Sequence, residues 1–429
     1  MLRRHGGSRR LAATVAVAVL VPVAAYSLVA VAGHSQPVAR AAGSPALLVA
    51  PGGSDAGCLR RAGTCGSLSG AYSRARPGDV IELAPGNYPL QRLPQRGLGG
   101  RPVVVRAAKP GTVSLAGLDV NTGSITIEGV RLTDGLAAQP GRSDSASSIA
   151  GITIKDVDMP WAFIYADQLR LEGGSVGGFN ACDPRNLEDG IEIWERDGVP
   201  TNGVTISGVL IHDVDGGHDG TCGGTAGAGR HVDCVQILGG QNVTIRGSIF
   251  TGCATSGVIA RPYEGARLGP VTIENNAFGR VLHPGSAIEL GDSGGGDACT
   301  GPMVVRANTI VEGGVNGACA GTSITVSSNI LETGACSDGL AYSHNVFPAG
   351  WSAQCGTGAR SCRVQYVQPS GGLPSYHLAA TDRCARNAGA ASGAADDIDG
   401  DARPGDAAPD AGADQWAPAR SFSGDQPAS

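Results

Sequence analysis

The residues best suited to chemistry lie in the segment Arg230-His-Val-Asp-Cys-Val-Gln236. This segment places His231, Asp233 and Gln236 close together. A histidine beside a carboxylate can take up or release a proton near neutral pH, as general acid–base catalysis requires. A histidine held by an aspartate also often serves only to fix a loop, so a structural role stays open. We take this segment as the first candidate for a site.

Three similar segments occur before and after it: D-G-I-E-I-W-E from Asp189, S-G-V-I-A-R-P from Ser256 and S-A-I-E-L-G-D from Ser286. Their apolar residues alternate with others, which predicts strands with one face in a core. If the strands are neighbours, they lie about 4.8 Å apart, and Asp189 and Asp233 then have to share a proton or a cation. The outward positions are expected to form one column: Glu192, Gln236, Ile259 and Glu289.

Such a column suits two reactions on an acidic polysaccharide. In a lyase or epimerase, Ca²⁺ bound to carboxylates neutralises a uronate while His231 or Arg261 removes a proton. In a hydrolase, two carboxylates about 5 to 9 Å apart act as acid and as base or nucleophile, and Asp189 or Glu192 with Asp233 fits that spacing. The predicted catalytic residues are His231, Asp233, Asp189, Glu192 and Arg261.

Other side chains are candidates for holding the substrate. Aromatic residues make up 4% of the chain, so Trp194 and Tyr263 beside the column are candidate stacking platforms for sugar rings. Packing at a partly buried surface is an equally common role. The preceding strand can extend the platform through Trp161, Phe163 and Tyr165. The predicted substrate-binding residues are Gln236, Trp194, Tyr263, Glu289 and Asp292.

A metal site is predicted in the longest loop that we expect within the repeats, which begins near residue 211. Asp213, Asp215 and Asp219 have the spacing of part of a calcium-binding loop, and a solvated loop without an ion is the alternative. Calcium is thus the candidate cofactor, and no organic cofactor is predicted.

An eight-residue phrase defines the elements that must position these residues. Its clearest copies are V-T-I-E-N-N-A-F from Val271, M-V-V-R-A-N-T-I from Met303, I-T-V-S-S-N-I-L from Ile324 and L-A-Y-S-H-N-V-F from Leu340. Apolar residues at its first, third and eighth places predict two short strands joined by a bend, and a third strand follows in each unit. The sequence therefore predicts an all-β, single-stranded parallel β-helix of three short sheets and about ten coils. Its asparagines are expected to stack as a scaffold, in left-handed backbone at the bend: Asn276, Asn308, Asn329 and Asn345.

Composition supports one solenoid domain. The chain has 68 glycines in 429 residues, as tight bends require, and a net charge of −6 offers no basic field for nucleic acid. Ser67 can cap a short helix to Ala75 over the first coil. We expect a β-helix with this cap over 42–395 and an acidic, Pro-rich tail or cap over 396–429. In that tail, Asp397-Ile-Asp-Gly-Asp401 is either a calcium ligand set or a solvated loop.

Residues 1–41 have the features of an export signal, with arginines before an apolar run that starts at Leu11. Cleavage after Ala41 makes this segment a signal peptide, and retention makes it a membrane anchor. Twelve cysteines without a CxxC pair favour disulfides in an oxidising compartment. The expected bridges join Cys58 to Cys65 and Cys362 to either Cys355 or Cys384. We expect a monomer that is secreted or anchored at the cell surface and meets a membrane only through an uncleaved leader.

The chain resembles secreted right-handed parallel β-helix proteins of the pectate-lyase-like superfamily. The resemblance rests on the opening Ala75-Arg-Pro-Gly-Asp-Val-Ile-Glu-Leu-Ala-Pro-Gly-Asn-Tyr88 and the closing Asp397-Ile-Asp-Gly-Asp-Ala-Arg-Pro404. It covers nearly all of the chain after the leader and implies a right-handed coil and a polysaccharide ligand. No catalytic motif of the superfamily transfers to this sequence. A polysaccharide lyase or hydrolase is therefore the leading hypothesis, and a non-catalytic glycan-binding or structural solenoid is the alternative.

Overall fold

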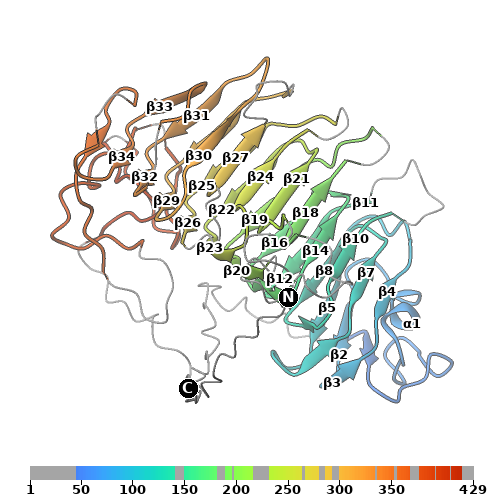
Figure 1. Ribbon diagram of the computed structural model, residues 1–429. Helices are drawn as coiled ribbons and strands as arrows, with labels where there is room; N and C mark the ends of the chain where they lie inside the picture. The colour runs from blue at the N-terminus through green and yellow to red at the C-terminus, as the bar shows by residue number, and fades with distance from the viewer. Residues whose placement is uncertain are drawn as a thin grey trace, which may run out of the picture.

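The computed structural model describes residues 45–140, 149–180, 189–195, 198–215, 231–262, 266–279, 286–291, 299–333, 336–351, 355–367, 376–391, 393–405 and 407–417. Strands follow one another around a common axis, and each pairs with strands of the coils before and after it (Figure 1). The pairing is parallel in all three long sheets. The predicted parallel β-helix is confirmed.

From β2 (Val80–Leu83) to β30 (Val315–Ala318), each coil contributes one strand to each long sheet, in the order first, second, third, and the last coils contribute only to the first two. The first sheet contains β1 (Leu47–Val49), β2 (Val80–Leu83), β5 (Val103–Ala107), β8 (Ile125–Glu128), β12 (Ile152–Lys155), β16 (Arg170–Glu172), β19 (Thr205–Ser207), β22 (Val243–Arg246), β25 (Val271–Glu274), β28 (Met303–Arg306), β31 (Ile324–Ser327) and β33 (Leu340–Ser343). The second contains β3 (Gly86–Tyr88), β6 (Val113–Leu115), β9 (Arg131–Leu132), β13 (Asp158–Met159), β17 (Ser175–Asn180), β20 (Leu210–Asp215), β23 (Ile249–Cys253), β26 (Ala277–Phe278), β29 (Thr309–Ile310), β32 (Ile330–Leu331), β34 (Val346–Phe347) and β35 (Arg360–Ser361).

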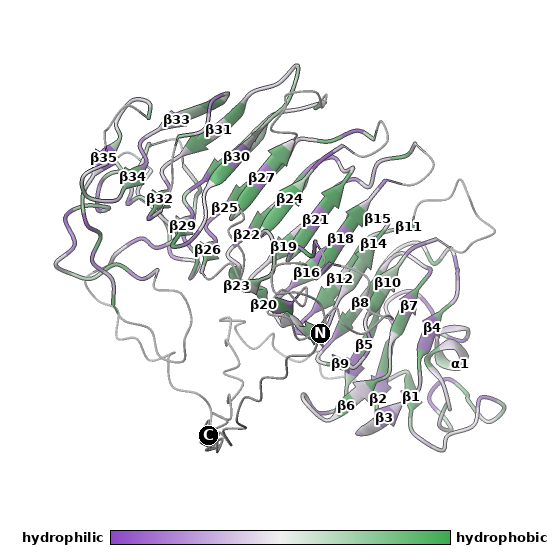
Figure 2. Ribbon diagram, in the orientation of Figure 1, coloured by the Kyte–Doolittle hydropathy of each residue, from purple (hydrophilic) through white to green (hydrophobic). Residues whose placement is uncertain are grey.

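The third sheet contains β4 (Gln91–Leu93), β7 (Leu118–Val120), β10 (Leu136–Ala138), β14 (Ala162–Ile164), β18 (Ile191–Trp194), β21 (Val235–Leu238), β24 (Val258–Ala260), β27 (Ile288–Gly291) and β30 (Val315–Ala318). A small additional pair joins β11 (Ile149–Ala150) to β15 (Ala166–Asp167). Hydrophobic residues are concentrated on the strands (Figure 2). Inward residues such as Ile125, Ile193 and Ile237 are fully buried, so the core runs along the inside of the solenoid.

A ladder of buried asparagines links the later coils, as predicted. The backbone N–H of Asn276 donates to Oδ1 of Asn308, and that of Asn308 donates to Oδ1 of Asn329, each at 2.9 Å. Asn345 continues the ladder. The sequence-based interpretation was wrong about the backbone, because the left-handed residue comes one place earlier, as at Ala307 (φ 53°). The asparagine side chain is left to bond the neighbouring coil.

Charged residues alternate along the outside of the first sheet. In register, Glu82 faces Arg106, which faces Glu128, followed by Lys155 and Glu172. Arg106 Nη2 lies 3.1 Å from Glu82 Oε2. Opposite charges on neighbouring strands stabilise a sheet and fix which strands pair.

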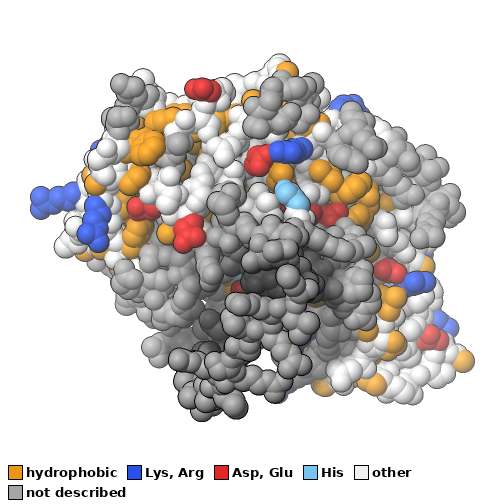
Figure 3. Space-filling model, in the orientation of Figure 1, with side chains coloured by type: hydrophobic (Ala, Val, Ile, Leu, Met, Phe, Trp, Pro, Cys, Tyr) orange, Lys and Arg blue, Asp and Glu red, His pale blue; other side chains and the backbone are white. Residues whose placement is uncertain are grey.

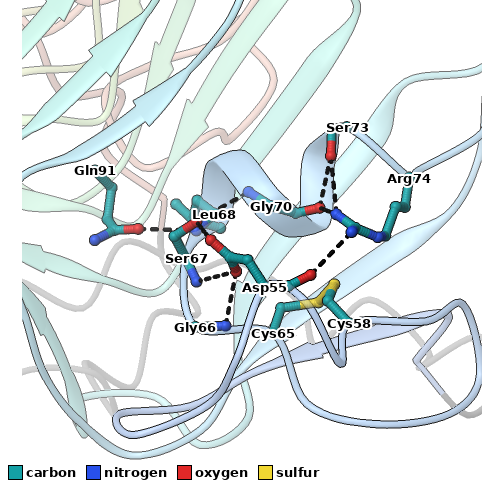
Figure 4. Close-up of a disulfide and its surroundings, with 10 residues drawn as sticks. All are labelled: Asp55, Cys58, Cys65, Gly66, Ser67, Leu68, Gly70, Ser73, Arg74 and Gln91. Atoms are coloured by element: carbon teal, nitrogen blue, oxygen red, sulfur yellow. Dashed lines mark hydrogen bonds between the residues drawn. A yellow bond between two sulfur atoms is a disulfide. The ribbon is translucent and has the colours of Figure 1, made fainter.

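Helix α1 (Leu68–Tyr72) covers the start of the solenoid and confirms the predicted cap. The Ser67 side chain accepts a hydrogen bond from the Gly70 N–H, and Asp55 in turn accepts from the Ser67 backbone and hydroxyl (Figure 4). These bonds hold the pKa of Asp55 below its ordinary value, the Ser67 hydroxyl contributing most. Leu68 N donates to Gln91 Oε1 at 2.8 Å, which attaches the helix to β4.

Five disulfides connect the described residues. Cys58–Cys65 is the predicted bridge (Figure 4), and Cys362 pairs with Cys384 rather than with Cys355. The remaining three are Cys234–Cys253, Cys299–Cys319 and Cys336–Cys355. Bridges of this number favour an oxidising compartment. No helix in the described ranges is long and apolar enough to span a membrane.

The described part of the C-terminal segment, from 376 to 417, packs against the bend between the first and second sheets. Gly412 N donates to Ser328 O at 2.8 Å, and the buried Arg403 donates to Asn275 Oδ1 at 3.1 Å. Asp397 is also buried, and its Oδ1 accepts from the N–H groups of Asp399 and Asp401. Asp397 therefore closes a turn whose tip, from Asp399 to Asp401, is exposed, as in the solvated loop considered from the sequence.

Candidate functional site

The outward positions of the third sheet form the predicted column. Glu192 faces Gln236 on the next coil, Gln236 faces Ile259, and Ile259 faces Glu289. Phe163 precedes Glu192 in the same column. Two of these side chains are less accessible than expected, since Glu192 is 2% and Ile259 is 3% exposed. Acidic, basic and histidine side chains gather on this side of the molecule, beside a hydrophobic area (Figure 3).

His231 and Asp233 lie together at the entry to β21. His231 Nδ1 lies 3.2 Å from Asp233 Oδ2, and the imidazole is 55% exposed whereas the carboxylate is 0% exposed. An Asp–His contact of this kind orients the ring and leaves its other nitrogen for a ligand or solvent. Sequence reasoning predicted the proximity of the two residues but not the difference in their exposure.

Burial raises the pKa of Asp233 to about 7, and the charge of Glu289 adds to the increase. The polar groups of Ser256 and Gln236 counter part of it. Within the described residues, neither carboxyl oxygen of Asp233 accepts a hydrogen bond with both a normal distance and a normal angle. We therefore take burial as the dominant effect. A carboxyl with this pKa holds a proton for part of the time at neutral pH, which suits a proton donor.

Asp189 has a different position from the one its spacing suggested. Its strand is adjacent to that of Asp233, as expected, but its Oδ1 accepts the backbone N–H of Asp233 at 2.5 Å. Glu192 Oε1 accepts the N–H of Asp189 at 3.2 Å. These contacts connect two coils at the strand entry, so Asp189 supports the backbone that carries Asp233.

The chain is constrained where it enters the third sheet. A Cβ atom on Gly190 would lie 2.6 Å from the Cys234 carbonyl oxygen, so the close approach of two coils requires glycine there. The Cys234–Cys253 disulfide joins the residue after Asp233 to the end of β23. This bridge, which we did not predict, holds the candidate site at the corner. Its sequence signal was the cysteine directly after Asp233.

Arg261, directly after β24, forms a salt bridge with Glu289. Arg261 is 40% exposed and Glu289 is 19% exposed, so the pair lies at the surface. The two residues come from adjacent coils. Arg261, which the sequence suggested as a catalytic residue, is thus paired with a carboxylate of the same column.

Three aromatic rings lie at the other end of the candidate site. The centroid of Phe163 is 5.0 Å from that of Tyr165 and 6.1 Å from that of Trp194, and Tyr165 lies 6.3 Å from Trp194. All three side chains are partly exposed, while Ala162 and Ile164 fill the core. The structure therefore assigns this strand's aromatic residues to the outer face.

The predicted calcium ligands are only partly described. Asp213 and Asp215 lie on β20 of the second sheet, so the loop prediction was wrong for these two residues. The Asp213 carboxylate is exposed and lies 2.9 Å from His212 Nδ1. Asp219 lies outside the described residues, as do Tyr263 and Asp292.

Within the described ranges, one group of three side chains has the spacing of metal ligands. It consists of His377, Asp399 and Asp414, whose ligand atoms lie within 4.8 Å of one another. His377 Nε2 lies 3.0 Å from Asp399 Oδ2, so an ion pair accounts for part of this cluster. The group belongs to the C-terminal segment and is separate from the candidate site.

Solved structures with similar folds include several enzymes that act on polysaccharides. The pectate lyase Pel9A is 16% identical, with a TM-score of 0.47, covering 87% of this chain and 97% of its own. An α-1,3-glucanase catalytic unit from Streptomyces thermodiastaticus is 16% identical, with a TM-score of 0.42 and coverages of 78% and 68%. The alginate lyase AlyGC is 13% identical, with a TM-score of 0.38 and coverages of 76% and 58%. No protein-family model and no curated protein sequence matches the chain.

Proposed function

We propose that this protein hydrolyses a polysaccharide on the outer face of its third sheet, with His231 and Asp233 acting together as the proton donor. The observation that carries the proposal is an exposed imidazole whose Nδ1 lies 3.2 Å from a fully buried carboxylate. Such a pair delivers a proton from its exposed edge and regains one from solvent.

Glu289 is the proposed second carboxylate. It lies on β27, two coils beyond β21, which corresponds to roughly 9 to 10 Å along the solenoid, and three residues further along its strand than the position level with Asp233. The two groups therefore leave room for a water molecule between them, as glycosidases that invert the anomeric centre require. The salt bridge to Arg261 holds the Glu289 carboxylate in place at the surface.

The reaction uses one water molecule. The His231–Asp233 pair gives its proton to the glycosidic oxygen as the bond from that oxygen to the anomeric carbon breaks. Water attacks the same carbon from the opposite side and loses a proton to Glu289. The products are two shorter chains, one with a new reducing end, and solvent restores both groups to their starting states.

Elimination on a uronate is less well supported by these residues. It needs a cation to offset the carboxylate of the substrate, and the charge of Arg261 is already offset by Glu289. A non-catalytic glycan-binding protein is the second candidate function. The complete burial of Asp233 favours it, because a structural His–Asp contact needs no access to substrate.

The test is a screen of neutral and uronate polysaccharides, with and without Ca²⁺, for new reducing ends and for the absorbance of unsaturated products. Hydrolysis gives reducing ends alone. His231→Ala and Asp233→Asn should each lower the rate at least 100-fold, whereas Asp119→Asn, which changes a residue paired with Arg92 near the start of the sheet, should leave it unchanged. Unsaturated products would show that the reaction is an elimination and not a hydrolysis. A folded protein that gives no product in either assay would support glycan binding without catalysis.

A further inference from the structure

We propose that Phe163, Tyr165 and Trp194 form a sugar-stacking subsite and that the polysaccharide bound there consists of neutral hexopyranose units. This inference rests on the proposed function of the neighbouring residues and names their substrate class. It replaces the acidic polysaccharide expected from the sequence.

The three rings form a platform that spans two adjacent coils. Ile164 on β14 faces Ile193 on β18, so Tyr165 comes opposite Trp194 on the outer side, and Phe163 faces Glu192. The ring planes of Phe163 and Trp194 differ by 32°, the smallest angle within this group. Two rings tilted by this amount offer a broad apolar surface with polar groups at its edge.

Core packing does not account for these rings. The inward positions of the same strands are filled by the buried Ala162, Ile164 and Ile193. Partly exposed aromatic side chains that cluster on one face of a soluble protein commonly mark a binding surface, because they bury large apolar area with little loss of conformational entropy. A pyranose ring offers a matching face of C–H groups.

The charges around the platform favour a sugar without a carboxylate. In the described strands of the third sheet and the described residue after each, the basic side chains are Arg92 and Arg261. Arg92 pairs with Asp119, and Arg261 pairs with Glu289. A uronate would therefore meet no unpaired cation among these residues, and a neutral sugar needs none.

The platform lies at the opposite end of the strands from the proton donor. Trp194 faces Leu238 on β21, five residues beyond Asp233, which corresponds to roughly 16 Å along the strand. A polysaccharide that contacts both groups therefore crosses the outer face of the sheet, and units held on the rings orient the part of it that reaches the His231–Asp233 pair.

The experiment measures binding and cleavage separately. Neutral gluco-, manno- and galacto-oligosaccharides and uronate oligosaccharides are titrated into the full chain, followed by calorimetry and by tryptophan fluorescence. We expect a neutral series to bind and to change the fluorescence of Trp194. Trp194→Ala should weaken that binding at least 10-fold and raise KM with little effect on kcat, whereas Trp351→Ala, at an exposed position near the end of the solenoid, should change neither.

Phe163→Ala and Tyr165→Ser provide a second test if Trp194→Ala does not fold, and each should weaken binding in the same direction. Tighter binding of uronates than of neutral sugars, or unchanged affinity in the folded variants, would overturn this inference. Cleavage that does not depend on the three rings would overturn it while leaving the proposed hydrolysis intact. Binding that depends on them without any product would instead refute the hydrolysis and keep the subsite.

Discussion

Replacing Asp233 by asparagine should change how the stability of the fold depends on pH. The carboxyl is fully buried, and burial raises its pKa from 3.8 to about 7. A carboxyl whose pKa is higher in the folded than in the unfolded chain stabilises the fold only while it is protonated. This contribution is complete below about pH 3.8 and is lost as the pH rises through about 7.

The size of the effect follows from the two pKa values. A tenfold change in an equilibrium constant corresponds to about 1.4 kcal/mol, so the difference between 3.8 and about 7 amounts to about 4 kcal/mol. The Asp233→Asn variant has no charge to bury at this position. As the pH rises from about 4 to about 8, the free energy of unfolding of the Asp233→Asn variant should therefore increase by about 4 kcal/mol relative to that of the unsubstituted protein.

Urea unfolding with intact disulfides, followed by tryptophan fluorescence across this pH range, measures the difference. Asp414→Asn is the matched control, since burial raises the pKa of Asp414 to about 7 as well but this residue lies in the C-terminal segment. It should show a similar gain in stability and keep full activity, whereas Asp233→Asn should lose activity. Parallel pH profiles for the unsubstituted protein and Asp233→Asn would refute the argument that an ionisable carboxyl is buried there.

Three further changes test the scaffold. Asn308→Ala removes an amide that bonds to neighbouring coils and leaves buried backbone groups unpaired, so it should lower the free energy of unfolding in urea by about 3 to 5 kcal/mol; a loss below about 1 kcal/mol would contradict the ladder. Glu274→Arg places like charges in register with both Arg246 and Arg306 and should cost about 1 to 2 kcal/mol in the same assay, and the added change Arg306→Glu should restore about half of it, because Arg246 keeps a like-charged neighbour. Replacing both Cys234 and Cys253 by alanine should cost about 3 kcal/mol and abolish cleavage, and full activity in that folded variant would show that the bridge does not position the site.

Much of the architecture was predictable because the coil is a local unit. Apolar residues two apart indicate a strand, and the regular asparagine indicates a bend. The eight residues from Val271 therefore already indicate the first two strands of a coil and the bend between them. The stacking of Asn276 on Asn308 and the Ser67 cap were also predictable, since each depends on a residue type with one strong structural preference.

Features that depend on neighbouring coils were harder to predict. The connections between strands differ in length, so the sequence does not show which residues become neighbours in the stack. Asp213 and Asp215 were assigned to a loop because their polar composition outweighed the pairing of β20 with β17 and β23. The burial of Glu192 was missed for a similar reason, because alternation predicts the face of a sheet and not its exposure.

The charges of two sheets argue that the third sheet carries the function. On the first sheet, the charges alternate in sign from Glu82 to Glu172 and again from Arg246 to Arg306, so each of them faces an opposite charge on a neighbouring strand and serves the stacking. On the third sheet, the column instead places Gln236 and Ile259 between Glu192 and Glu289, and a buried carboxyl lies beside it at Asp233. Burial raises the pKa of Asp414 in the C-terminal segment as well, so a buried carboxyl does not by itself mark a reaction. What distinguishes Asp233 is its contact with the exposed imidazole of His231, at the entry to a sheet whose outer column lacks the paired charges seen at Glu274 and Arg306.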